Sequence, residues 1–292
     1  MYFLGIALLV IACIGIALII WGLIEASWVK ITRDTFEIGS SGTSQYSSSG
    51  DKEDLRILFF SDVHAEACMV PPIKLARIIA QEHENGGLDA VIFGGDTVNH
   101  ARHALKGYKY MIYVSETCKA LKIPFWGVTG NHDYPMELED IGALPMDYMG
   151  GVIKYLKSRV DGRYIAFGGV GDTGRHDRIW FAPPTPSDEF NHKSYIMLAH
   201  NPDIVLHMPP ELPFKVNGII SGHIHGGQIR TPFKLEFLLR KDELPHMGII
   251  SGIHEVNGIK LFISKGIGCV LVPIRFFCRP EVNILSIKVN DK

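Results

Sequence analysis

The sequence predicts an α/β fold with a parallel or mixed β-sheet, preceded by one N-terminal transmembrane helix. Three observations lead to this prediction. The first 24 residues carry no charged side chain. Further along, short runs of branched and aromatic residues end in Gly, Asp, Asn or His, as buried strands do. Helical stretches separate the early runs, and this alternation favours a sheet whose strands are mainly parallel.

The N-terminal segment, residues 1–24, is long enough to cross a bilayer. As a helix rising ~1.5 Å per residue it would reach ~36 Å, against a hydrocarbon core of ~30 Å. Trp21 and Trp28 lie where an interfacial aromatic belt is expected. A cleaved signal peptide is the alternative, but no Lys or Arg precedes the apolar run, and no convincing small-residue cleavage site follows it. We expect a permanent span, with the bilayer as a partner.

The charges that flank the span predict its orientation. Lys30 and Arg33, on its C-terminal side, are the nearest cationic side chains. By the positive-inside rule, the rest of the chain should face the cytoplasm. The five cysteines are an odd set without a C-x-x-C pair, which agrees with a reducing compartment. We therefore expect a single-pass protein of the inner or cell membrane with its main domain in the cytoplasm.

The remaining elements follow in chain order. Residues 29–38 alternate branched and polar side chains and suit an edge strand. Residues 39–50, GSSGTSQYSSSG, bury too little apolar surface to become ordered and should form a mobile tether. Residues 25–50 are thus a juxtamembrane segment, and the main domain spans 51–292. In it we expect helices at 72–84 and 106–121, and strands at 55–60, 90–93, 124–128, 164–167, 195–199, 218–220, 260–263 and 282–289.

Five of the expected strands end in Asp, Asn or His. An open sheet collects its ligands at the carboxyl ends of its strands, so these side chains should lie close together. The strand ends are S-D-V-H at 61–64, G-G-D at 94–96, G-N-H-D at 130–133, A-H-N-P at 199–202 and S-G-H-I-H-G-G at 221–227.

Each motif by itself has an ordinary structural explanation. D-x-H is often a surface accident, and G-G-D or G-N-H-D is also common turn chemistry. G-H-x-H-G-G is more specific, because it places two imidazoles at i and i+2 between glycines that allow close approach. Together and in this order, the motifs predict a metal site formed by Asp62, His64, Asp96, Asn131, His200, His223 and His225.

The ligand types restrict the metal. Imidazole, carboxylate and amide ligands without a thiolate favour Mn²⁺, Fe²⁺ or Zn²⁺. Seven ligand-type residues exceed the need of one tetrahedral zinc, and they suit two ions that share a bridging carboxylate. We expect two divalent ions, with Mn²⁺ as the first choice.

The motif series resembles that of the calcineurin-like metallophosphoesterase superfamily, from Leu55 to about Val289. The stretches G-H-I-H-G-G-Q-I at 222–229 and F-I-S-K-G-I-G at 262–268 are similar to its membrane-associated bacterial branch. That branch includes the YkuE-like and YaeI-like phosphoesterases and the LpxG-type UDP-2,3-diacylglucosamine hydrolases. The protein phosphatases are less similar. They have D-R-G after the second motif and G-N-H-E as the third, where this chain has T-V-N and G-N-H-D.

The resemblance implies a four-layer αββα sandwich of two mixed sheets between helices. It also implies two metal sites that share Asp96, one with Asp62, His64 and His225 and the other with Asn131, His200 and His223. His132 is the motif histidine left over, and it would face the phosphoryl group, stabilising its charge or protonating the leaving oxygen. The metal pair would lower the pKa of a bridging water, so that hydroxide forms near neutral pH and attacks in line with the leaving group.

Other features have weaker support. His100 follows the second motif, and Arg175 and Arg178 belong to a small basic cluster. Each could bind substrate, although solvated surface is the ordinary explanation. Asp172 could support a ligand or simply end a turn. Residues 233–239 could form a cap that dips into the membrane interface, or an ordinary packed helix.

Composition and topology direct the functional prediction. A net charge of −2 excludes the basic surface with which many proteins bind nucleic acid. A membrane tether keeps an enzyme close to lipid, so we expect a phosphoesterase that cleaves a phosphodiester or pyrophosphate bond in a lipid-linked substrate such as UDP-2,3-diacylglucosamine. A broad-specificity phosphodiesterase or a phospholipid-headgroup hydrolase is the alternative. A non-catalytic metal-bound scaffold is more remote, because every ligand position is filled.

Overall fold

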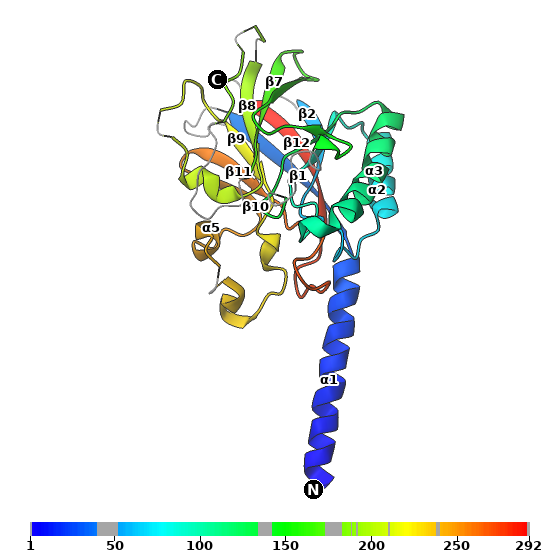
Figure 1. Cartoon of the computed structure of the whole chain (residues 1–292). Helices are drawn as coiled ribbons and strands as arrows, with labels where there is room; N and C mark the ends of the chain where they lie inside the picture. Colours follow the sequence, from blue (N-terminus) through cyan, green and yellow to red (C-terminus); the bar gives the residue numbers. More distant parts are fainter. Residues whose placement is uncertain are drawn as a thin grey trace.

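The computed structural model describes residues 2–39, 52–133, 142–172, 183–187, 189–190, 192–209, 211–237 and 240–290, except for the side chains of residues 233 and 234. It shows an α/β domain from which one long helix extends (Figure 1). The tether predicted at 39–50, apart from its first residue, lies outside the described residues, as do Arg175 and Arg178.

The N-terminal helix α1 (Tyr2–Ser27) projects from the domain over most of its length (Figure 1). By length and composition it is apolar enough to cross a membrane. Gly22, Glu25 and Ala26 are buried, which shows that the last turns of the helix pack against the domain. The helix therefore continues past residue 24, where we expected the span to end, and its last turn belongs to the domain surface.

The first sheet has six strands, in the order β1 (Lys30–Gly39), β12 (Glu281–Asn290), β2 (Leu55–Phe60), β3 (Ala90–Phe93), β4 (Phe125–Gly127) and β5 (Asp147–Tyr148). β12 is antiparallel to β2, and the other neighbouring pairs are parallel. β1 confirms the edge strand predicted at 29–38. Its alternate residues Phe36 and Ile38 are buried, which matches the pattern in the sequence.

The second sheet also has six strands, in the order β10 (Gly252–Val256), β11 (Ile259–Ile263), β9 (Gly218–Ser221), β8 (His192–Ala199), β7 (Tyr164–Val170) and β6 (Ile153–Lys157). The edge strands β5, β6 and β10 were not predicted. They are short or partly exposed, and therefore lack the continuous apolar runs that mark the central strands.

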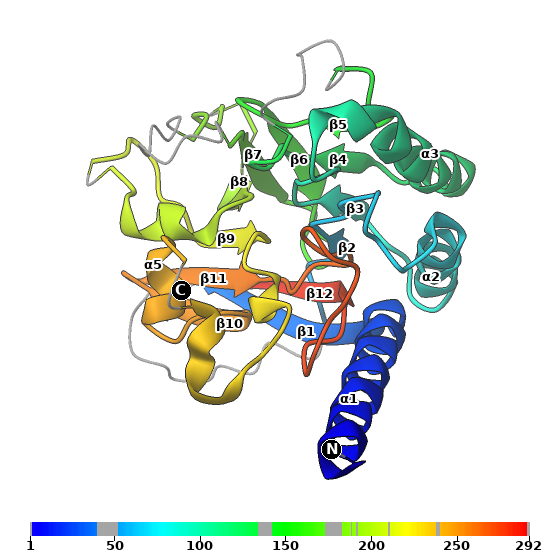
Figure 2. The same cartoon turned by 60° about the horizontal axis from the view of Figure 1, so that its bottom comes forward.

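An apolar core separates the two sheets, and Phe59 of β2 meets Phe262 of β11 edge-on in it. Helices α2 (Pro72–Glu84) and α3 (Ala104–Leu121) cover the outer face of the first sheet (Figures 1 and 2). Short helices, η2 (Pro202–Leu206) and α5 (Glu243–His246), pack on the second. The predicted two-sheet α/β fold is confirmed, with only short helices outside the second sheet in the described residues.

Strand register places the end of α1 beside the loops that carry the motifs. Lys30 of β1 pairs with Glu281 at the start of β12, and Asn283 of β12 pairs with Phe59 near the end of β2. Because β12 is antiparallel to β2, the start of β1 lies at the edge where β2, β3 and β4 end. We call this the carboxyl edge. The helix therefore leaves the domain at the carboxyl edge.

Candidate metal centre

At the carboxyl edge, backbone hydrogen bonds join the motif loops within each sheet, and the N–H of His223, after β9, donates to the carboxylate of Asp62, after β2, over 3.1 Å. The N–H of Asp62, after β2, donates to the carbonyl oxygen of Gly95, after β3, over 2.8 Å. The N–H of Gly222, after β9, donates to the carbonyl oxygen of His200, after β8, over 3.0 Å. Side chains that are far apart in the sequence therefore converge, as the strand-end pattern predicted.

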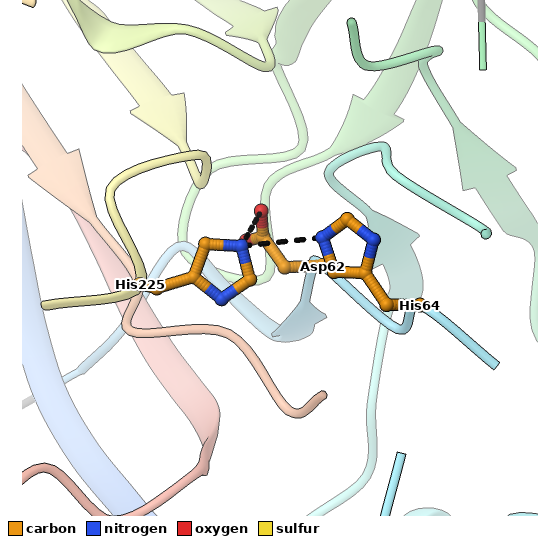
Figure 3. Close-up of side chains that lie close together, drawn as sticks. All are labelled: Asp62, His64 and His225. Atoms are coloured by element: carbon orange, nitrogen blue, oxygen red, sulfur yellow. Dashed lines mark hydrogen bonds and ion pairs between the residues drawn. The ribbon is translucent and has the colours of Figure 1, made fainter. Parts of the chain in front are cut away.

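The first cluster consists of Asp62, His64 and His225, all buried (Figure 3). Nε2 of His225 lies 3.2 Å from Oδ1 of Asp62 and 3.2 Å from Nε2 of His64. The two imidazole rings stack with their centroids 5.1 Å apart. Two ring nitrogens that face each other beside a carboxylate are a suitable donor set for one cation.

The second cluster consists of Asp96, His200 and His223. Nε2 of His200 lies 3.1 Å from Oδ2 of Asp96 and 3.2 Å from Nδ1 of His223. Nδ1 of His200 donates to the carbonyl oxygen of Gly94 over 2.7 Å. Because a carbonyl oxygen only accepts, this bond fixes the proton on Nδ1 and leaves Nε2 available to a cation.

Asp96 faces both clusters. Its Oδ2 is 3.1 Å from Nε2 of His200 and 3.5 Å from Nε2 of His64. Its Oδ1 accepts the backbone N–H of His132 over 2.8 Å. The carboxylate is therefore held from one side while it faces ligands of both groups, which is the arrangement that a bridging ligand needs.

The backbone at the site is strained. Five of the seven predicted ligands have a positive φ: 55° at Asp62, 42° at His64, 63° at Asp96, 70° at His223 and 55° at His225. The left-handed region costs a non-glycine residue about 1–2 kcal/mol. Such conformations concentrate at functional sites, where the surrounding structure imposes them.

Two motif glycines allow the backbone to approach the carboxylates. A Cβ atom at Gly130 would lie 2.2 Å from Oδ1 of Asp96, and one at Gly222 would lie 2.6 Å from Oδ2 of Asp62. Any side chain at these positions would displace the carboxylates. The glycines of G-N-H-D and G-H-x-H are thus part of the site's construction.

The surroundings also set the protonation states. Burial disfavours the charged form of Asp62, but His225, His200 and His64 outweigh it and hold the pKa of Asp62 well below its usual range. Burial alone would raise the pKa of Asp96, but nearby imidazoles, above all His200, lower it. Burial alone would lower the pKa of His200, but the nearby carboxylates, above all Asp96, raise it. Burial lowers the pKa of His64 to about 3 and also lowers that of His225. Near neutral pH the carboxylates are charged and the imidazoles of His64 and His225 are neutral, as metal ligands must be. His200 keeps a second proton, which a cation at Nε2 would displace.

The donor set fits a pair of divalent cations. Oδ1 of Asn131 is buried and has no hydrogen-bond partner among the described residues, which suits an oxygen that binds a cation. The two clusters contain imidazole and carboxylate groups and no thiolate. This combination favours Mn²⁺, Fe²⁺ or Zn²⁺. One cation in each cluster would offset the negative charge of Asp62 and Asp96.

His132 lies beside the first cluster without belonging to it. Its ring is 5.1 Å from that of His64, edge to face. Its Nδ1 donates to the carbonyl oxygen of Asn99 over 3.0 Å, so Nε2 is the nitrogen that remains for a substrate. Sequence reasoning missed Asn99, which orients this ring from the T-V-N segment.

Asp133, the last residue of G-N-H-D, ties two motif loops together. Its fully buried carboxylate accepts the N–H groups of Asp96 and Thr97, both over 2.8 Å, and that of Gly130 over 2.9 Å. Burial and the nearby Asp96 raise the pKa of Asp133 to about 6. Sequence reasoning assigned Asp133 no role, although its place in the motif was a signal.

We predict that Asp133→Asn destabilises the domain and weakens metal binding. An amide N–H₂ would oppose a backbone N–H, and a buried unsatisfied donor costs about 1–3 kcal/mol. Metal affinity should fall roughly 10–100-fold, as for other residues that orient ligands. Urea unfolding and Mn²⁺ titration measure the two effects, with the exposed Asp147→Asn as control. Wild-type stability and affinity would contradict this role.

Asp242 orients His223. Its Oδ1 lies 3.0 Å from Nε2 of His223, and its Oδ2 accepts a hydrogen bond from Nε of Arg240 over 2.8 Å. The contact turns Nδ1 of His223 toward His200. Burial disfavours charge on Asp242, but His223 and Arg240 hold its pKa below the usual range. Sequence reasoning missed Asp242, since nothing in the local pattern K-D-E marks it.

For Asp242→Ala we predict a metal-binding isotherm that separates into two phases. The site that contains His223 should weaken roughly 10–100-fold, because the ring loses the group that orients it. The site that contains His64 and His225 should keep its affinity. Calorimetric titration with Mn²⁺ resolves the two phases. Equal weakening of both sites would mean that Asp242 acts on the fold as a whole.

The weaker predictions fare differently. His100 is exposed and belongs to neither cluster. Asp172 is close enough to raise the pKa of His200, although burial and Asp96 act on that pKa more strongly. Part of the stretch at 233–239 lies in η4 (Pro232–Phe237), where Phe237 is buried in the core and Leu235 is exposed.

Comparison with known proteins agrees with this geometry. Residues 55–227 match the calcineurin-like phosphoesterase family. The chain is 28% identical to the metallophosphoesterase YkoQ of Bacillus subtilis, over 88% of this chain and 93% of YkoQ. It is 24% identical to the metallophosphoesterase YkuE of the same organism, over 82% of this chain and 81% of YkuE. It is 27% identical to the phosphodiesterase YaeI of Escherichia coli, over 90% of each chain.

These comparisons confirm the resemblance to YkuE-like and YaeI-like proteins, while the resemblance to LpxG-type hydrolases stays a prediction. The matched residues cover more than half of the chain and include every predicted metal ligand and His132. Six of the seven predicted ligands lie in the two clusters at the carboxyl edge. The chain belongs to the calcineurin-like phosphoesterase family and is a metal-dependent hydrolase of phosphoric esters.

Proposed function

We propose that the protein is a membrane-anchored phosphoesterase with two metal ions, which hydrolyses a phosphodiester or pyrophosphate bond in a lipid-linked substrate. The observation that carries the lipid assignment is the position of α1. The helix leaves the domain at the carboxyl edge, where the metal clusters lie. If α1 spans the bilayer, the clusters face the membrane from which a lipid substrate would be reached.

The roles of the residues follow from their positions. One divalent ion would be held by Asp62, His64 and His225. The other would be held by Asn131, His200 and His223, and Asp96 would bind both ions. Two such ions supply charge for the phosphoryl oxygens and lower the pKa of water. His132 presents Nε2 beside the first cluster, where it would protonate the leaving oxygen or stabilise phosphoryl charge.

The proposed topology places the domain in the cytoplasm, since Lys30 and Arg33 follow the span. A nucleotide-linked lipid such as UDP-2,3-diacylglucosamine combines an acyl anchor with a diphosphate and would meet the site at the cytoplasmic leaflet. A second candidate is a broad-specificity phosphodiesterase, which the name of the Escherichia coli relative favours.

The test compares two substrates on the purified full chain in detergent micelles with Mn²⁺. One is UDP-2,3-diacylglucosamine and the other is soluble bis-p-nitrophenyl phosphate, with Asp96→Asn as the blank. A kcat/KM for the lipid well above that for the diester supports the proposal. Turnover of the diester alone would retain the two-metal chemistry and exclude the lipid substrate. Metal binding without turnover of either would favour a scaffold.

A further inference from the structure

A loop beside α1 exposes large apolar side chains to solvent. Leu271 is 73% exposed, Val272 47% and Phe277 78%. Outside α1, Leu271 and Phe277 are the most exposed large apolar side chains among the described residues. We call residues 270–277 the apolar loop.

The backbone of the apolar loop is strained in a way that presents these side chains. Leu271 has a φ of 61° and Phe277 a φ of 51°. A positive φ in a bulky residue is rare, and it persists only where the surrounding contacts impose it. The exposure of Leu271 and Phe277 is therefore built into the fold.

The contacts that hold the loop are extensive. The fully buried guanidinium of Arg275 donates to the carbonyl oxygens of Gly268 over 2.6 Å and Cys278 over 3.2 Å. The side-chain amide of Gln228 accepts from the N–H of Val270 over 2.7 Å and donates to its carbonyl oxygen over 3.1 Å. A loop held in this way cannot fold its apolar side chains back onto the domain.

The apolar loop is also attached to the end of α1. The carboxylate of Glu25 accepts the N–H groups of Phe277 over 3.0 Å and Cys278 over 2.6 Å. The N–H of Arg275 donates to the carbonyl oxygen of Gly22 over 3.1 Å. In both views the loop lies beside the point where α1 enters the domain (Figures 1 and 2). A helix that spans a bilayer would thus bring the loop to the membrane surface.

On its other side, the loop borders the metal centre. The side chain of Asn99 accepts the N–H of Leu271 over 3.3 Å, while its backbone carbonyl oxygen accepts Nδ1 of His132. Just before the loop, the N–H of Gly268 donates to the carbonyl oxygen of Asp62 over 2.8 Å. The apolar loop therefore connects the end of α1, through Asn99, to His132, and the residues just before it contact the motif loop that carries Asp62.

We propose that the apolar loop is a second membrane-contacting element, which inserts Leu271, Val272 and Phe277 into the lipid interface. Aromatic and aliphatic side chains on a rigid surface loop bind the boundary between headgroups and acyl chains. Together with α1, the loop holds the carboxyl edge of the domain against the bilayer. The inference rests on the membrane-anchored form of the proposed function, because the occupant of the surface is the bilayer that α1 crosses.

The experiment places an environment-sensitive fluorophore on one introduced cysteine of the full chain in phosphatidylcholine–phosphatidylglycerol vesicles. In a Cys13→Ala, Cys68→Ala background, in which the remaining native cysteines are buried, the labelled positions are Leu271→Cys and Phe277→Cys. The control is Val160→Cys, which is 51% exposed. Its neighbour Arg159 contacts Asp89, which precedes β3, so the control lies at the edge opposite the carboxyl edge. Turnover of soluble bis-p-nitrophenyl phosphate shows that each labelled variant is folded.

We expect blue-shifted emission at positions 271 and 277, quenched several-fold by nitroxide groups carried on lipid chains, and unquenched emission at 160. Emission at 271 and 277 as water-exposed as at 160 would overturn the inference. A blue shift without quenching by lipid-borne nitroxides would also overturn it, because the partner would then be a protein surface. Flotation of the vesicles separates the two proposals. A chain that floats with water-exposed labels contradicts the loop alone, whereas one that does not float contradicts the anchor and the loop together.

Discussion

Replacing Asp96 by asparagine is expected to abolish turnover and to remove metal from both clusters. The buried carboxylate faces Nε2 of His200 and Nε2 of His64, so that its charge acts on both sites. An amide of the same size retains the shape and loses the charge. A metal pair held here would supply several kcal/mol of transition-state stabilisation, and each ~1.4 kcal/mol is tenfold in rate. Turnover should therefore fall by about 10³-fold or more.

Elemental analysis after gel filtration, together with hydrolysis of bis-p-nitrophenyl phosphate, measures both effects. The matched control is again Asp147→Asn, which removes an exposed carboxylate from β5. Two equivalents of metal retained in Asp96→Asn would show that this carboxylate does not bridge, even if turnover fell.

Replacing His132 by alanine should leave the metal content at the wild-type value and lower kcat by roughly 10²–10⁴-fold, the range typical of general acid–base catalysis. The ring lies beside His64, and its Nδ1 is bonded to Asn99 rather than to a member of either cluster. The loss should depend on the leaving group. If Nε2 protonates the leaving oxygen, an alkyl diester should lose far more rate than a p-nitrophenyl diester, because p-nitrophenolate leaves without a proton.

Equal losses for the two diesters would assign His132 to stabilisation of phosphoryl charge instead. Full activity of His132→Ala on both would remove it from the mechanism. Asn99 gives a further control, because its backbone carbonyl orients the ring and survives substitution. Asn99→Ala should therefore cost less than His132→Ala.

The site could be predicted because its residues occur at strand ends. Asp62 lies two residues after the end of β2 and Asp96 three residues after the end of β3, and parallel strands bring the residues that follow them to one edge. The pair His223 and His225 carried the most specific signal, since two imidazoles between glycines rarely have a structural role. At these strand ends, the position of a residue just after a strand is enough to predict which distant residues lie near it.

The parts that could not be predicted depend on tertiary contacts. The side chain of Asp242 contacts that of His223, 19 residues earlier in the chain. The sequence around Asp242 is that of an ordinary polar turn. The edge strand β10 is partly exposed, so its apolar pattern is weak. The attachment of Glu25 to the backbone at Phe277 joins residues far apart in the chain. The hydrophobic pattern around Glu25 or Phe277 does not predict this contact.

The central claim is that this chain holds two metal ions which share Asp96. Anomalous diffraction from crystals loaded with Mn²⁺ tests it most directly. The account predicts two peaks per chain: one among Asp62, His64 and His225, the other among Asn131, His200 and His223, and both in contact with the carboxylate of Asp96. A single peak, or a second peak away from Asp96, would contradict it.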